Sequence, residues 1–207
     1  GTGEYTEKKS RFIAEVYSVS CEEEAFAYLE EVKKRYWDAR HHCWAYVIGR
    51  NPGSERMSDD GEPAGTAGKP ILEVIRGRKV TDIFVVVTRY FGGTLLGTGG
   101  LVRAYTSAAA AALSDTVIIT RISAFKLDIH TDYTGLGKIQ YLIGRRGLDI
   151  LDTAYTDKVV ISIVIPEEEE GSFTKEVLEG TNGQAVLEKK GKCWFARTEN
   201  GVEIWEV

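Results

Sequence analysis

The segment from Asp82 to Leu113 constrains the fold more than any other part of this 207-residue chain. It opens with DIFVVVT (Asp82–Thr88), a nearly continuous apolar run that is typical of a strand buried on both faces of a sheet. The glycine-rich stretch Phe91–Gly100 follows, and the alanine-rich segment Leu101–Leu113 then predicts a helix. We therefore expect a buried strand, a glycine-rich turn and a helix in succession.

The residues before this segment predict two more strands, Phe12–Val19 and His42–Ile48, which are separated by a helix that ends near Trp37. The stretch Gly49–Gly68 is rich in glycine and proline and lacks periodicity, so it predicts a long loop. Loops longer than about 12–15 residues in a compact domain are usually functional or mobile. A short helix is expected near Pro70–Arg76.

The pattern changes after Thr120, where apolar and polar residues alternate in half-exposed strands. The expected order of strand, helix, strand, strand, helix and strand is that of a ferredoxin-like split βαββαβ unit. We therefore expect an α+β protein with two domains, residues 1–120 and 121–207. The elements behind this prediction are a strand at Phe125–His130, a helix at Tyr133–Arg146, strands at Ile150–Tyr155 and Val159–Ile165, a helix that Pro166 opens, and strand-like segments near the end.

The net charge of −5 gives no reason to expect nucleic acid or an anionic membrane as partner. The charge is uneven, however, because the segment Lys69–Arg103 carries six basic and two acidic residues. A local excess of this kind usually forms a solvated face.

Three cysteines, Cys21, Cys43 and Cys193, occur in the chain without CxxC spacing, which argues against a disulfide framework or a structural zinc site. The chain has neither an apolar run of membrane-spanning length nor a signal-peptide pattern at its start. We expect a cytoplasmic protein that does not bind membranes and has no cofactor.

The glycine-rich stretch is the strongest candidate for a binding surface. A helix that starts after such a loop exposes unpaired N–H groups that attract anions, and Thr98 is a natural cap for it. The spacing matches neither Walker A nor GxGxxG. Glycines for tight turns and close packing explain the pattern equally well. The residues proposed for anion or partner binding are Lys69, Arg89, Gly92, Gly93, Gly97, Gly99, Gly100 and Arg103.

Three carboxylates, Asp59, Asp60 and Glu62, form a second candidate group in the loop. They could hold a hard cation, although the spacing does not fit an EF-hand loop, or supply acid–base chemistry. They could also pair with Arg89 and Arg103 as an internal clasp, so the presence of a metal stays open.

The sequence His41-His42-Cys43 contains residue types found in catalytic pairs. Neighbours two apart on a strand are too distant for a nucleophilic Cys–His pair, so we expect Cys43 to be a small core residue. His42 lies on the opposite strand face and could line a site. We assign no residue a catalytic role.

Two segments resemble the signature of the Impact family, in its bacterial YigZ-type branch: SDDGEPAGTAGKPIL (Ser58–Leu72) and VTRYFGGTLLGTGGLVRAY (Val87–Tyr105). SRF at Ser10–Phe12 and HHCWAY at His41–Tyr46 also fit, so the resemblance covers essentially the whole chain. It implies an N-terminal domain with the ribosomal-protein-S5 domain-2-like fold. It also implies a C-terminal ferredoxin-like domain similar to domain V of elongation factor G.

The resemblance also suggests a function, because eukaryotic members of the family regulate translation by competing for the activator of an initiation-factor kinase. Bacteria lack that circuit in its eukaryotic form. Our first hypothesis is a non-enzymatic, translation-associated regulatory protein that binds the ribosome, RNA or a translation factor. The alternative is a hydrolase-like enzyme acting on a phosphorylated or anionic small molecule. We cannot place a nucleophile–base pair in the sequence, which favours binding; the oligomeric state stays open.

Overall fold

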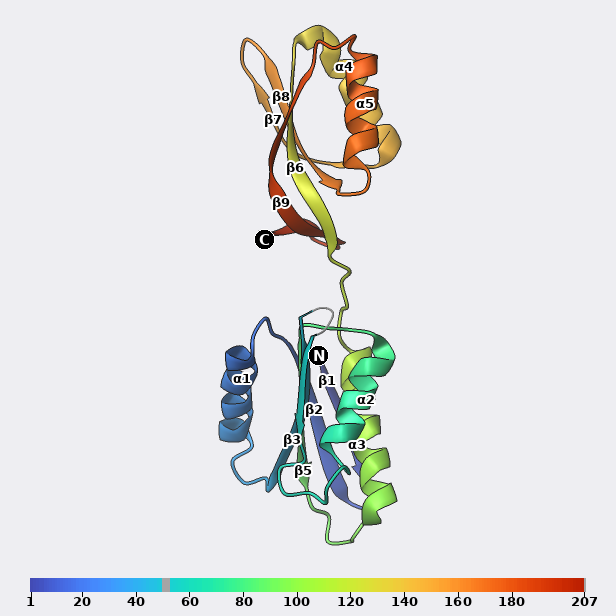
Figure 1. Ribbon diagram of the computed structural model, residues 1–207. Helices are drawn as coiled ribbons and strands as arrows, with labels where there is room; N and C mark the ends of the chain where they lie inside the picture. Colours follow the sequence, from blue (N-terminus) through green and yellow to red (C-terminus); the bar gives the residue numbers. More distant parts are fainter. Residues whose placement is uncertain (50–52, 207) are drawn as a thin grey trace. The chain divides into compact units, whose positions relative to one another are not determined.

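The computed structural model describes residues 1–49 and 53–206, which form a two-domain α+β protein (Figure 1). The chain divides into two compact units, Gly1–Ile118 and Ile119–Val207. Each unit contains its own five-stranded sheet and its own apolar core. Among the described residues, no helix is both long and apolar enough to cross a bilayer.

The N-terminal unit is a sheet in the order β1-β2-β5-β3-β4, with helices on both faces (Figure 1). Helix α1 covers one face, and α2 and α3 cover the other. Every neighbouring pair of strands is antiparallel. The elements are β1 (Thr2–Glu7), β2 (Ser10–Ser18), α1 (Glu22–Arg35), β3 (His41–Ile48), β4 (Ser54–Ser58), α2 (Gly68–Arg78), β5 (Ile83–Tyr90) and α3 (Gly97–Ser114).

The central strand β5 is buried on both faces, as its apolar run predicts. Val85 and Val87 pack toward α2 and α3, whereas Phe84 and Val86 pack toward α1. The small side chains of Ala104, Ala108, Ala109 and Ala112 let α3 pack closely against the sheet.

Three predictions for this unit need correction. The loop predicted at Gly49–Gly68 contains strand β4, which forms because β3 supplies its hydrogen-bond partners; residues 50–52 of that loop lie outside the described residues. Helix α2 extends two residues beyond the predicted Pro70–Arg76 at each end. Helix α3 begins at Gly97 with Leu96 at its cap position, so Thr98 lies inside the helix and is not its cap.

The C-terminal unit has the βαββαβ order of a ferredoxin-like fold, with a further strand β10 added after β9. Its sheet order is β10-β9-β6-β8-β7, and α4 and α5 cover one face (Figure 1). Its elements are β6 (Ile122–Thr131), α4 (Tyr133–Arg146), β7 (Asp149–Tyr155), β8 (Val159–Pro166), α5 (Glu170–Gly180), β9 (Val186–Thr198) and β10 (Gly201–Glu206).

Helix boundaries in this unit follow local capping chemistry. Helix α4 has the predicted ends, because the Asp132 carboxylate accepts a hydrogen bond from the Gly135 amide and Gly147 ends the helix with a left-handed φ of 62°. Helix α5 starts at Glu170, later than predicted. Pro166 does not open it, because this proline is the last residue of β8 and pairs with Ala124 of β6.

Candidate functional site at the end of the N-terminal sheet

Asp59 organises the loop between β4 and α2. Its carboxylate accepts hydrogen bonds from the backbone amides of Gly65 (2.8 Å), Ala67 (3.0 Å) and Gly68 (2.8 Å). The residue at the cap position of α2 makes no side-chain capping bond, so Asp59 supplies the negative charge that the start of this helix favours. Both oxygens of the Asp59 carboxylate thus accept hydrogen bonds from the backbone.

Glu62 lies in a buried polar cluster beneath the same loop. One of its carboxylate oxygens is 2.6 Å from an Arg89 guanidinium nitrogen and accepts a hydrogen bond from the Tyr105 hydroxyl at 2.9 Å. The side chains of Glu62 and Arg89 are only 4% and 7% exposed. Tyr105 also accepts a hydrogen bond from the Cys43 thiol. This cluster ties the loop to the end of β5 and to α3.

The buried position of the cluster makes nucleophilic chemistry by Cys43 unfavourable. Burial raises the pKa of the Cys43 thiol and the pKa of the Tyr105 hydroxyl well above their usual ranges. Both groups therefore stay protonated near neutral pH. Cys43 is fully buried among apolar residues, so the prediction of a small core residue agrees with its place in the structure.

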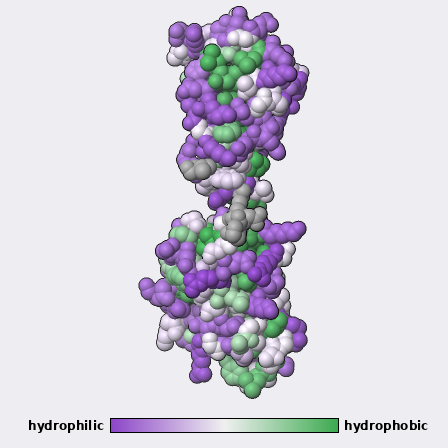
Figure 2. Space-filling model, in the orientation of Figure 1, coloured by the Kyte–Doolittle hydropathy of each residue, from purple (hydrophilic) through white to green (hydrophobic). Residues whose placement is uncertain are grey.

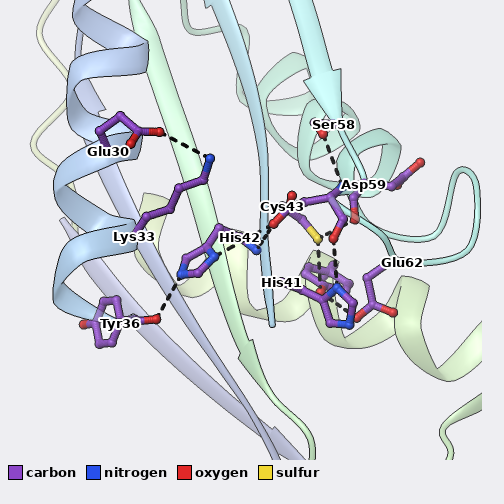
Figure 3. Close-up of polar contacts among 11 residues, drawn as sticks. Glu30, Lys33, Tyr36, His41, His42, Cys43, Ser58, Asp59 and Glu62 are labelled. Carbon is purple, nitrogen blue, oxygen red and sulfur yellow. Dashed lines mark hydrogen bonds and ion pairs between the residues drawn. The ribbon is translucent and has the colours of Figure 1, made fainter. Parts of the chain in front are cut away.

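Asp60 holds the start of β3, where the rings of His41 and His42 lie on opposite faces of the sheet (Figure 3). Its carboxylate accepts a hydrogen bond from the His42 amide at 2.6 Å, and the His41 ring donates to its backbone carbonyl at 2.8 Å. The His42 ring turns to the other face of the sheet and donates to the Tyr36 carbonyl. Burial lowers the pKa of His42, which is 6% exposed.

The three carboxylates thus point to three different partners and do not converge on a common metal position. Among residues 1–49 and 53–206, one group of three side chains has the spacing of a metal site, Asp128, His130 and Glu188 in the C-terminal unit. There the Lys190 ammonium already lies 2.8 Å from Glu188 and 3.5 Å from Asp128. Lys190 thus supplies the positive charge that this group attracts.

Most glycines of the loop after β5 serve the fold. A side chain at Gly92 would come within 2.0 Å of the Lys9 backbone, and its amide donates to the buried Ser10 hydroxyl. Gly93 and Gly97 adopt positive φ angles of 85° and 70°. A Cβ atom at Gly100 would lie 3.0 Å from the Leu96 side chain, whereas Gly99 is exposed and meets no such restriction.

The outer surface of this loop combines apolar groups with a free positive charge. Phe91 and Leu95 are 56% and 84% exposed. Arg103 is exposed and forms no ion pair with any residue that the structure describes. Its guanidinium reaches back toward the helix start, since one of its nitrogens lies 3.7 Å from the place a Cβ would take on Gly99. The first turn of α3 contains no acidic residue and has no side-chain cap.

The basic residues between Lys69 and Arg103 divide into two sets. Arg89 pairs with Glu62, Arg76 pairs with Glu55 and Glu73, and Arg78 donates to Ser114. Lys69 at the start of α2 and Lys79 after its end are exposed, like Arg103, and have no ion pair among the described residues. The structure therefore separates Arg89 from Arg103, which the sequence had grouped in one site.

Comparison with known proteins covers both units. Residues 8–113 match the model of the Impact N-terminal domain, and residues 129–184 match a domain of unknown function (DUF1949). The IMPACT family member YvyE of Bacillus subtilis is 36% identical over 100% of this chain and 95% of its own length. The chain belongs to the Impact family.

Two further matches also cover most of the chain. The IMPACT family member YigZ of Escherichia coli is 37% identical over 87% of this chain and 89% of its own length. A crystal structure described as that of a hypothetical protein is 36% identical, covers 90% of this chain and 91% of its own, and has a TM-score of 0.58. The N-terminal unit is therefore an Impact N-terminal domain, and the ferredoxin-like unit follows it in the chain.

Proposed function

We propose that this Impact family protein is a non-enzymatic regulator associated with translation, and that its N-terminal unit binds phosphate groups of the ribosome at the start of α3. Membership of the family supports the link to translation. The surface chemistry supports a phosphate-bearing partner, because a helix start and an arginine both favour anions.

The observation that carries the proposal is the position of Arg103. Every carboxylate of the neighbouring signature loop is bound elsewhere: Asp59 at α2, Asp60 at His42 and Glu62 at Arg89. None of these three carboxylates pairs with Arg103, whereas Glu62 joins the loop to Arg89. An arginine directed at an uncapped helix start places two positive features together, and an external anion resolves that arrangement.

An enzyme remains the alternative class, and the polar residues of the site argue against it. A hydrolase needs an accessible nucleophile or a general base with a suitable pKa. Here the thiol of Cys43 is buried with a raised pKa, and backbone amides or Arg89 hold the carboxylates of the loop. These groups build the fold of the loop instead of facing a substrate.

Ribosome co-sedimentation of the full chain with the Arg103→Ala variant tests the proposal. One phosphate contact to an arginine is a charge-assisted hydrogen bond worth roughly 1.5–3 kcal/mol. We therefore expect the ribosome affinity of Arg103→Ala to be about tenfold lower or more, so that a smaller fraction of it pellets with ribosomes. The melting temperature should stay unchanged because Arg103 has no ion pair among the described residues.

Arg78→Ala is the matched control, since it removes the same charge at the C-terminal end of α2 and leaves the start of α3 unchanged. It should leave ribosome binding near the wild-type value. Equal binding of the wild type and Arg103→Ala, with both proteins folded, would reject Arg103 as the contact.

A further inference from the structure

Trp37 is the most exposed tryptophan of the chain, and this exposure is a reason to look for a ligand. It lies in the turn between α1 and β3 and is 82% exposed. Trp44, by contrast, packs in an aromatic cluster, and Arg121 lies 4.4 Å over the ring of Trp205. The ring of Trp37 makes no aromatic or cation contact with any described residue. An exposed indole forgoes the large stabilisation that burial gives this side chain.

The residues around Trp37 are basic in a chain that is acidic as a whole. From Lys33 to His42 the sequence KKRYWDARHH contains four basic residues and one acidic residue, Asp38. Lys33 and Arg35 pair with Glu30 and Glu15. Lys34 and Arg40 are exposed and have no ion pair with a residue that the structure describes. These two cations flank the indole in sequence and remain available to an anionic partner.

This turn lies at the same end of the sheet as the glycine-rich loop. The Asp38 carboxylate accepts a hydrogen bond from the Tyr90 hydroxyl at 2.7 Å, which ties the turn to the last residue of β5. The glycine-rich loop starts at the next residue, Phe91. Figure 1 shows the turn after α1 and the loop after β5 at one end of the unit, and Figure 2 shows an apolar patch there on a mainly hydrophilic surface.

We propose that Trp37 stacks on an unpaired base of single-stranded RNA while Lys34 and Arg40 contact the adjoining phosphates. The inference rests on the proposed function and deepens it by naming the chemistry of the partner. Aromatic side chains flanked by cations bind single strands because an unpaired base offers a free π-face and its backbone offers charge. A base in a duplex is already stacked and does not offer that face.

Fluorescence anisotropy with two labelled probes tests the proposal on the full chain. One probe is an unstructured RNA of about 12 nucleotides, within the usual site sizes of single-strand binders, and the other is an abasic ribose-phosphate oligomer of equal length and charge. The wild type should prefer the RNA over the abasic probe by about 5-fold to 150-fold, the range that one stacked base provides.

Trp37→Ala should abolish this preference while leaving the affinity for the abasic probe unchanged, and Trp37→Phe should keep part of it. Tyr141→Ala is the control: this exposed tyrosine of α4 already has Lys138 and Arg145 near its ring, so its loss should change neither affinity. An unchanged preference in Trp37→Ala, an absence of preference in the wild type, or an absence of RNA binding overturns the inference. Ribosome binding that depends on Arg103 would survive each of these results, so the two proposals fail separately.

Discussion

The ion pair between Glu62 and Arg89 is the most deeply buried pair of opposite charges among the residues that the structure describes. Removal of one partner leaves the other charge without compensation in an apolar surrounding, which includes the rings of Phe12 and Phe91 near the guanidinium. We expect Glu62→Ala to lower the free energy of unfolding by about 3–5 kcal/mol in urea denaturation.

The double variant Glu62→Leu with Arg89→Met separates loss of packing from loss of charge. It removes both charges and keeps apolar volume, so it should be more stable than Glu62→Ala. A loss below about 1 kcal/mol for Glu62→Ala is the value typical of an exposed pair and would contradict the structural role of this cluster.

Helix α2 depends on a carboxylate from outside the helix, since Asp59 accepts three backbone hydrogen bonds at its start. Replacement of a capping residue by alanine costs about 0.5–2 kcal/mol, and we expect Asp59→Ala to reach the upper part of this range. Chemical denaturation measures the loss. Asp59→Asn keeps one acceptor oxygen and should lose less, and equal stability of both variants and the wild type would count against the capping role.

The elements differ in how far the sequence predicts them. The ends of α4 follow from Asp132 and Gly147, and the apolar run of β5 identifies it, because these signals lie within the element. Strands β1 and β4 lie at the sheet edges and depend on hydrogen bonds from β2 and β3. The residues of β4 are mostly exposed, and those of β1 alternate between exposed and half-buried. A local pattern cannot reveal an element that a distant partner creates.

The candidate site shows the same limit. Arg89 and Glu62 are 27 residues apart, and only the antiparallel sheet and the loop around Asp59 bring them together. The sequence therefore identified the polar residues, but it did not show which carboxylate forms an ion pair with each arginine. The exposed Trp37 was missed although its basic neighbours are visible in the sequence, because exposure of an aromatic residue is a property of the fold.

At the scale of the whole molecule, we propose that the two units are independent folding domains. Each has its own sheet and core, and the sequence change near residue 121 lies close to the boundary between Ile118 and Ile119. Fragments 1–118 and 119–207 should each show cooperative thermal unfolding by circular dichroism. An unfolded 1–118 fragment beside a folded full chain would show that the N-terminal unit needs the rest of the protein.

The most direct test of the phosphate-binding account is the salt dependence of ribosome affinity for the wild type and Arg103→Ala. Contacts to phosphates release counterions, so the logarithm of affinity falls linearly with the logarithm of salt concentration. Loss of one phosphate contact should reduce the magnitude of this slope by about 1 in Arg103→Ala. The same slope in both proteins, or a wild-type affinity that does not change with salt, would contradict binding of ribosomal phosphates at the start of α3.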